Sequence, residues 1–213
     1  MFRDVAQPGR ALALGARSRE FESRRPDHFQ PLTGVSDPAS RSPTMASDLL
    51  NITISAFRDQ GWAFRSVSGV EVIESEFEAH HAKVPLHVQV YPDAGVVCVV
   101  ARLSLPVPRS HRLAACELMM RTNKELNVGN FEVDWDDGTV MFRVTNIFTV
   151  DQADPRVIAG LVHTAVAEVD RLTPFMGEIC RTPKGELLLL NIAKLMQRTE
   201  LLPPPSELLG QAG

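Results

Sequence analysis

The stretch VPLHVQVYPDAGVVCVVARLSL, residues 84–105, decides the fold of this chain. From Val84 to Tyr91, aliphatic side chains occupy every second position, which is the period of a strand with one buried face. The next four residues, Pro92 to Gly95, have the composition of a tight turn. Val96 to Leu105 is apolar on both faces until Arg102, as expected of a central strand. Two strands joined by so short a turn form a hairpin, so the sheet is predicted to be antiparallel.

A second hairpin is predicted further along the chain. Apolar residues alternate with acidic ones over residues 131–135, Asp-Asp-Gly at 136–138 supplies the turn, and the alternation resumes over 140–145. Asp-Gly between two alternating runs is a strong hairpin signal. Shorter alternating runs at residues 62–64 and 70–77 precede the first hairpin. We therefore expect a sheet of about five strands.

Four segments have the spacing of amphipathic helices, and they are residues 48–60, 110–127, 154–173 and 183–198. The third opens on a capping aspartate and a proline, and it is predicted to end before Pro174, because proline breaks a helix interior. Four leucines inside the fourth segment also fit a strand, but the helix propensity of leucine favours a helix. The predicted fold class is α+β, an antiparallel sheet with helices packed on one face.

The first 44 residues have no sustained helix or strand period, and they hold seven arginines, five acids and no lysine. Such a segment could not bury enough apolar surface to offset its ordering entropy. A disordered arm and a transit peptide are two interpretations, and the five acids count against the second. We favour a third, a spurious extension, because Arg3–His28 resembles a translated transfer-RNA gene; Met45 would then be the start.

The rest of the chain is expected to divide into three parts. Residues 45–180 form one α+β domain, residues 181–200 an additional C-terminal helix, and residues 201–213 a flexible tail that contains three consecutive prolines.

The charge distribution argues against nucleic-acid and membrane partners. Net charge is −4, and residues 1–44 hold seven of the 22 basic and five of the 26 acidic side chains, so the remainder carries −6. Binding to nucleic acid or to an anionic membrane rests on lysine and arginine. The sequence has no apolar run long enough to span a bilayer and no secretory leader. Three widely spaced cysteines fit reduced thiols, so we expect a cytoplasmic protein.

No catalytic constellation is apparent, and no catalytic, cofactor-binding or metal-binding residues are predicted. The sequence lacks GxSxG, GxGxxG, Walker and HExxH motifs. Asp134, Asp136 and Asp137 are interpreted as turn and solvation residues.

A histidine cluster leaves one alternative open, a metal-binding protein or enzyme that uses the His80–His87 region. Strand alternation would point His80 and His81 in opposite directions, so at most one could join His87. A solvated loop before a strand is the favoured interpretation.

Three residues are expected to contribute to an interaction surface, and they are Asn123, Trp135 and Tyr91. Asn123 borders the apolar stripe of its helix, where a hydrogen bond to neighbouring backbone is the more ordinary role.

The segments His111–Asn123, Gly129–Asp134 and Asp137–Arg143, the last reading DGTVMFR, resemble the YbjN family of bacterial sensory-transduction regulators. The order of elements from about 47 to 173 is similar to that family as well. The resemblance implies a fold like that of type III secretion chaperones, often dimeric, with no catalytic residues to transfer. It also implies a non-enzymatic regulatory or protein-binding role, with a second copy and a protein or peptide segment as partners. The final segment, 183–199, departs from the family pattern and puts a simple transfer of the dimer interface in doubt.

Overall fold

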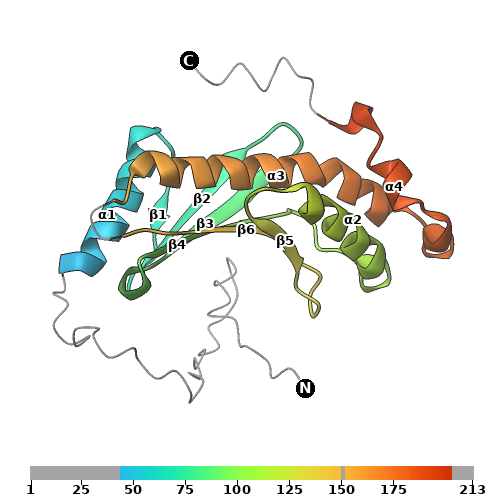
Figure 1. Ribbon diagram of the computed structural model, residues 1–213. Helices are drawn as coiled ribbons and strands as arrows, with labels where there is room; N and C mark the ends of the chain where they lie inside the picture. The colour runs from blue at the N-terminus through green and yellow to red at the C-terminus, as the bar shows by residue number, and fades with distance from the viewer. Residues whose placement is uncertain (1–43, 150–151, 203–213) are drawn as a thin grey trace, which may run out of the picture.

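The computed structural model describes residues 44–149 and 152–202, and the predictions for residues 1–43 and for most of the tail lie outside that part. Four α-helices, six strands and several 3-10 turns follow one another in the described residues (Figure 1). In chain order they are α1 Thr44–Asp59, β1 Arg65–Ser66, β2 Val72–Glu78, β3 Lys83–Tyr91, η2 Pro92–Ala94, β4 Val96–Arg102, η3 Arg109–His111, α2 Arg112–Glu125, β5 Asn130–Val133, β6 Val140–Ile147, α3 Pro155–Arg181, η4 Lys184–Leu189, α4 Ile192–Leu195 and η5 Thr199–Leu201.

The sheet has six antiparallel strands in the order β1-β2-β3-β4-β6-β5, one more than the expected number of about five. Both predicted hairpins, β3–β4 and β5–β6, are present. The second hairpin joins the first through its return strand, because β6 and not β5 pairs with β4. The α+β class with an antiparallel sheet is therefore confirmed.

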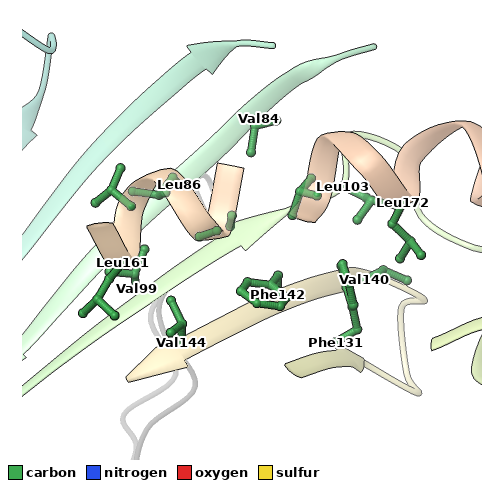
Figure 2. Close-up of a cluster of buried hydrophobic side chains, with 14 of the residues drawn as sticks. Val84, Leu86, Val99, Leu103, Phe131, Val140, Phe142, Val144, Leu161 and Leu172 are labelled. Carbon is green, nitrogen blue, oxygen red and sulfur yellow. The ribbon is translucent and has the colours of Figure 1, made fainter. Parts of the chain in front are cut away.

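A single hydrophobic core lies between the sheet and the helices. Side chains of one strand parity face it, among them Val84 and Leu86 of β3, Val99 of β4 and Phe142 of β6 (Figure 2). α3 runs along the sheet above these residues and adds Leu161 and Leu172 (Figures 1 and 2). Burial of each such side chain contributes about 1.5–3 kcal/mol, so this layer dominates the stability of the fold.

The helix predicted to end before Pro174 continues to Arg181, so that prediction was wrong. A proline inside a helix removes one hydrogen bond and costs about 3 kcal/mol. The cost is offset because the apolar stripe resumes beyond the proline, where Phe175, Met176 and Ile179 are all buried. Packing, not local propensity, decides where α3 ends.

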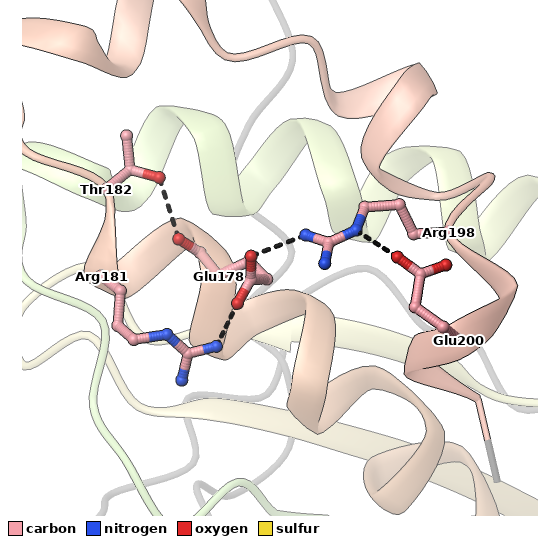
Figure 3. Close-up of polar contacts among 5 residues, drawn as sticks. All are labelled: Glu178, Arg181, Thr182, Arg198 and Glu200. Carbon is pink, nitrogen blue, oxygen red and sulfur yellow. Dashed lines mark hydrogen bonds and ion pairs between the residues drawn. The ribbon is translucent and has the colours of Figure 1, made fainter.

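The single C-terminal helix predicted for residues 183–198 is also replaced by shorter elements, η4, α4 and η5, and no strand forms at the four leucines. α4 is one turn long and is capped by Asn191, whose side chain accepts a hydrogen bond from the Lys194 amide at 2.9 Å. Its Ile192 and Leu195 are buried. Arg198 then reaches back to Glu178 of α3 at 2.7 Å (Figure 3). This segment therefore packs onto the main domain.

Candidate interaction surfaces

α1 and α3 lie on one side of the sheet and α2 lies beside its edge strand β5, so the strand residues of the other parity form a second face (Figure 1). We call it the open face. One row of residues crosses it in register, because Glu74 pairs with His87, His87 with Val100, and Val100 with Arg143. The face also carries Val72, Gln89, Tyr91, Cys98, Arg102, Glu132 and Met141.

His87 lies at the centre of the open face and is only 6% exposed. Its Nε2 atom is buried without a hydrogen-bond partner among the described residues. Burial, with the nearby charges of Arg102 and Arg143, lowers the pKa of His87 to about 4. The imidazole is therefore neutral at physiological pH.

Two ion pairs flank this centre. On the β1 side Arg65 pairs with Glu74. On the β5 side Arg143 donates to Glu132 from Nε at 3.0 Å and from Nη2 at 2.5 Å, and its Nη1 lies 3.4 Å from Cys98 Sγ. Each acid of this central region is thus already held by its own arginine.

Exposed apolar residues also lie on α2 and on η4. Leu113 and Met120, two helical turns apart on α2, are 77% and 68% exposed. Leu188 and Leu189 on η4 are 97% and 83% exposed. η4 contacts η3, which leads directly into α2. We call these four residues the α2–η4 patch.

The three residues predicted for an interaction surface do not come together. Asn123 forms hydrogen bonds with the backbone of Phe131, so the predicted bond to neighbouring backbone is confirmed. Trp135 is 54% exposed at the β5–β6 turn, where its carbonyl accepts a hydrogen bond from Arg112 and the guanidinium lies 6.0 Å from the ring centroid. Tyr91 lies half-buried on the open face, near the opposite end of the sheet, and burial raises its pKa.

The histidine cluster of the alternative interpretation is not assembled. His80 and His81 lie in the bend between β2 and β3, with ring centroids 4.5 Å apart, so strand alternation does not separate them as predicted. His81 binds the buried Asp170 of α3 through its amide at 2.7 Å, on the helix side of the sheet, whereas His87 faces the open side. Within residues 44–149 and 152–202, no three His, Cys, Asp or Glu side chains are placed to hold a metal ion.

The aspartates beside Trp135 serve the hairpin turn, as predicted. Asp134 Oδ1 accepts from the Asp136 amide at 2.9 Å, and Asp137 Oδ1 accepts from the Thr139 amide at 2.7 Å. Such bonds are typical of Asx turns.

A small hollow lies between α1 and the β6–α3 connection, lined by Leu49, Ile52, Pro92 and Phe148 among others. Its volume is about 50 Å³, far below the several hundred Å³ of small-molecule sites.

A family model described as "Putative bacterial sensory transduction regulator", YbjN, matches residues 54–178 of the sequence, more than half of the chain. The chain belongs to the YbjN family. The match ends at Glu178, the residue that Arg198 reaches from the C-terminal segment, so α4 lies beyond the family model and packs onto the part it covers.

Two solved structures are similar to this YbjN-family chain. The crystal structure of the ExsC–ExsE complex contains a chain with a TM-score of 0.48 and 9% identity, over 61% of this chain and 93% of that one. The crystal structure of YbjN, "a putative transcription regulator from E. coli", gives 0.43 and 10%, over 56% and 86%. No curated protein matches the sequence. None of the described helices is both long and apolar enough to cross a membrane.

Proposed function

We propose that this chain is a non-enzymatic, chaperone-like regulatory module of the bacterial cytoplasm, which binds protein and works as a homodimer. The α2–η4 patch is the observation that carries the proposal. Large apolar side chains left exposed close together on an element, as Leu113 and Met120 are on α2, are typical of protein contacts. The three cysteines, Cys98, Cys116 and Cys180, are all free, which fits a reducing compartment.

The outer side of α2 supports a two-fold contact between copies. Leu113 and Met120 lie on one stripe of the helix, with Cys116 and Glu117 midway between them. Two copies of α2 packed antiparallel place Leu113 of each against Met120 of the other, and the two-fold axis then passes beside Cys116. An isologous contact of this kind uses the same patch twice.

The polar residues on this side of α2 are compatible with burial in such a contact. Glu117 already accepts a hydrogen bond from Arg121 at 2.8 Å, so neither charge would enter the interface alone.

Light scattering during gel filtration of the full chain tests the homodimer. We expect the wild type to have a mass of twice 23.5 kDa and the double variant Leu113→Asp, Met120→Asp a mass of 23.5 kDa. Both side chains are exposed in the single chain, so the two substitutions should leave the monomer folded. Ile147→Asp is the matched control, because Ile147 is 72% exposed but lies at the end of β6. A monomeric wild type, or a double variant of unchanged mass, would refute the homodimer.

A further inference from the structure

The centre of the open face contains a buried polar atom that has nothing to bind. His87 Nε2 is enclosed without a hydrogen-bond partner among the described residues. An unsatisfied buried donor or acceptor destabilises the folded protein, because it has lost its hydrogen bonds to water and gained none in return. A hydrophobic residue in this place, like the neighbouring Val100 that is 0% exposed, would avoid that cost. His87 therefore destabilises the unliganded fold, and a ligand that forms a hydrogen bond with Nε2 would remove that destabilisation.

The same region carries a cation that is not neutralised. Arg102 is half-buried on β4, two residues from Val100 on the same face, and makes no hydrogen bond or ion pair with any described residue. Of the two nearby charges that lower the pKa of His87, that of Arg102 has a larger effect than that of Arg143.

The acids of the open face are engaged elsewhere. Glu74 and Glu132 pair with Arg65 and Arg143, and Glu78 pairs with Lys83 at 2.7 Å. Glu76, on the exposed edge of β2, acts on Lys83 and contributes to the raised pKa of that lysine. The uncompensated charge at the centre is therefore positive.

We propose that the open face binds a carboxylate-bearing, otherwise apolar segment of a partner protein, with the carboxylate held by Arg102 and His87. The inference rests on the proposed protein-binding function and names the surface and the chemistry of the partner. Neutral imidazole donates from Nε2–H to one carboxylate oxygen, and the guanidinium binds the other. Met141, which pairs with Arg102 in register, and Tyr91 are half-buried on the same face, and the flanking apolar residues of the segment lie against them.

Selection of random 12-residue peptides displayed on phage, with the full chain as immobilised target, provides the probe. We expect the enriched peptides to share one aspartate or glutamate between apolar residues. The best peptide is then synthesised in two forms, one with the acid and one with the corresponding amide, and the Kd of each is measured by fluorescence anisotropy.

Two variants of the protein make the test specific. Arg102→Gln removes the charge, and His87→Phe removes Nε2 while keeping an aromatic ring. Each should weaken binding of the acidic peptide by about tenfold or more, which is the size of one charge-assisted hydrogen bond. Arg58→Gln is the control, because Arg58 is an exposed cation on α1 on the other side of the molecule. Exchange of the acid for the amide should weaken binding to the wild type but not to Arg102→Gln.

The outcomes separate this inference from the proposed function. Peptides that bind equally well to wild type, Arg102→Gln and His87→Phe would overturn the open-face site and leave protein binding intact. Peptides without an acid, or a loss of the homodimer in Arg102→Gln, would also overturn it. A selection that enriches no peptide would count against both. In the predicted case, the side-chain ¹⁵N signals of His87 shift when the acidic peptide is added to wild-type protein.

Discussion

Asn123 binds the backbone of Phe131 as a neighbouring strand would. Its Oδ1 accepts from the Phe131 amide at 2.7 Å, and its Nδ2 donates to the Phe131 carbonyl at 3.0 Å. Phe131 belongs to β5, the edge strand of the sheet, and an unpaired edge is a template for aggregation. One side chain of α2 therefore both closes part of this edge and fixes the helix beside it.

Replacement of Asn123 by alanine should destabilise the protein. Two hydrogen bonds to a half-buried backbone are lost, and at roughly 1 kcal/mol each we expect a decrease of about 2 kcal/mol in the free energy of unfolding. Urea titration measures the change. Asn127→Ala is the control, because Asn127 is exposed in the loop that follows α2. Equal stability of the two variants would show that the pairing contributes nothing.

The stability of the protein should fall in mild acid because of His87. Its pKa is about 4 in the folded protein and near 6.5 when unfolded, so the unfolded chain binds the proton more readily. The resulting loss begins as the pH falls below about 6.5 and is complete below about 4, where it reaches about 3 kcal/mol.

The variant His87→Phe isolates this contribution. Without the imidazole, the free energy of unfolding between pH 7 and pH 4 should decrease less than in the wild type. The comparison is between the pH profiles and not between the stabilities at pH 7, because phenylalanine removes the unsatisfied nitrogen but is also larger than histidine. Identical pH profiles of variant and wild type in urea titrations would contradict the buried neutral histidine.

Replacement of Gly138 by alanine should destabilise the protein through both its positive φ and a steric clash, and Gly69 shares only the first of these. Its φ is +81°, and a Cβ there would lie 2.2 Å from the carbonyl oxygen of Val107. Gly69 has nearly the same φ, +80°, but a Cβ added to it would meet no atom within 4 Å. Gly69→Ala should cost about 1–2 kcal/mol from backbone strain alone, and Gly138→Ala clearly more. Thermal unfolding of both variants measures the losses of stability. Equal losses would show that the hairpin turn moves enough to relieve the clash with Val107.

The C-terminal segment should be held by its apolar residues and not by its ion pairs. Ile192 is 2% exposed, and Ile192→Ala should lower the free energy of unfolding by about 2–5 kcal/mol. Arg198 lies at the surface, and Arg198→Gln should give no measurable change despite its contacts with Glu178 and Glu200 in Figure 3. Denaturant melts compare the two. A larger loss of stability from Arg198→Gln than from Ile192→Ala would show that the ion pairs hold the C-terminal segment.

The parts of the fold that sequence could predict are those fixed by neighbours in the chain. The β3–β4 hairpin follows from strict alternation around a four-residue turn, and alternation alone assigns His87 to the face opposite Val88. The end of α3 could not be predicted in this way. Pro174 is a local stop signal, and it is overridden by burial of Phe175 and Met176 against elements distant in sequence.

The candidate surfaces are only partly predictable for the same reason. Tyr91 is expected at a surface and does lie on the open face, but the row that joins His87 to Arg143 depends on β6 pairing with β4. Nothing local to either hairpin specifies that long-range pairing. Arg102 ends a strand pattern in the sequence, and only the assembled sheet shows that it lacks a partner among the described residues.

Oxidative cross-linking of the full chain tests the central claim of self-association most directly. Cys116 lies midway between Leu113 and Met120, so a two-fold axis through this stripe brings the Cys116 thiols of two copies together. Under mild oxidation we predict a disulfide-linked species of twice 23.5 kDa that persists in Cys98→Ser and Cys180→Ser but is absent in Cys116→Ser. A chain that stays at 23.5 kDa, or a cross-linked species that survives in Cys116→Ser, would contradict the proposed homodimer.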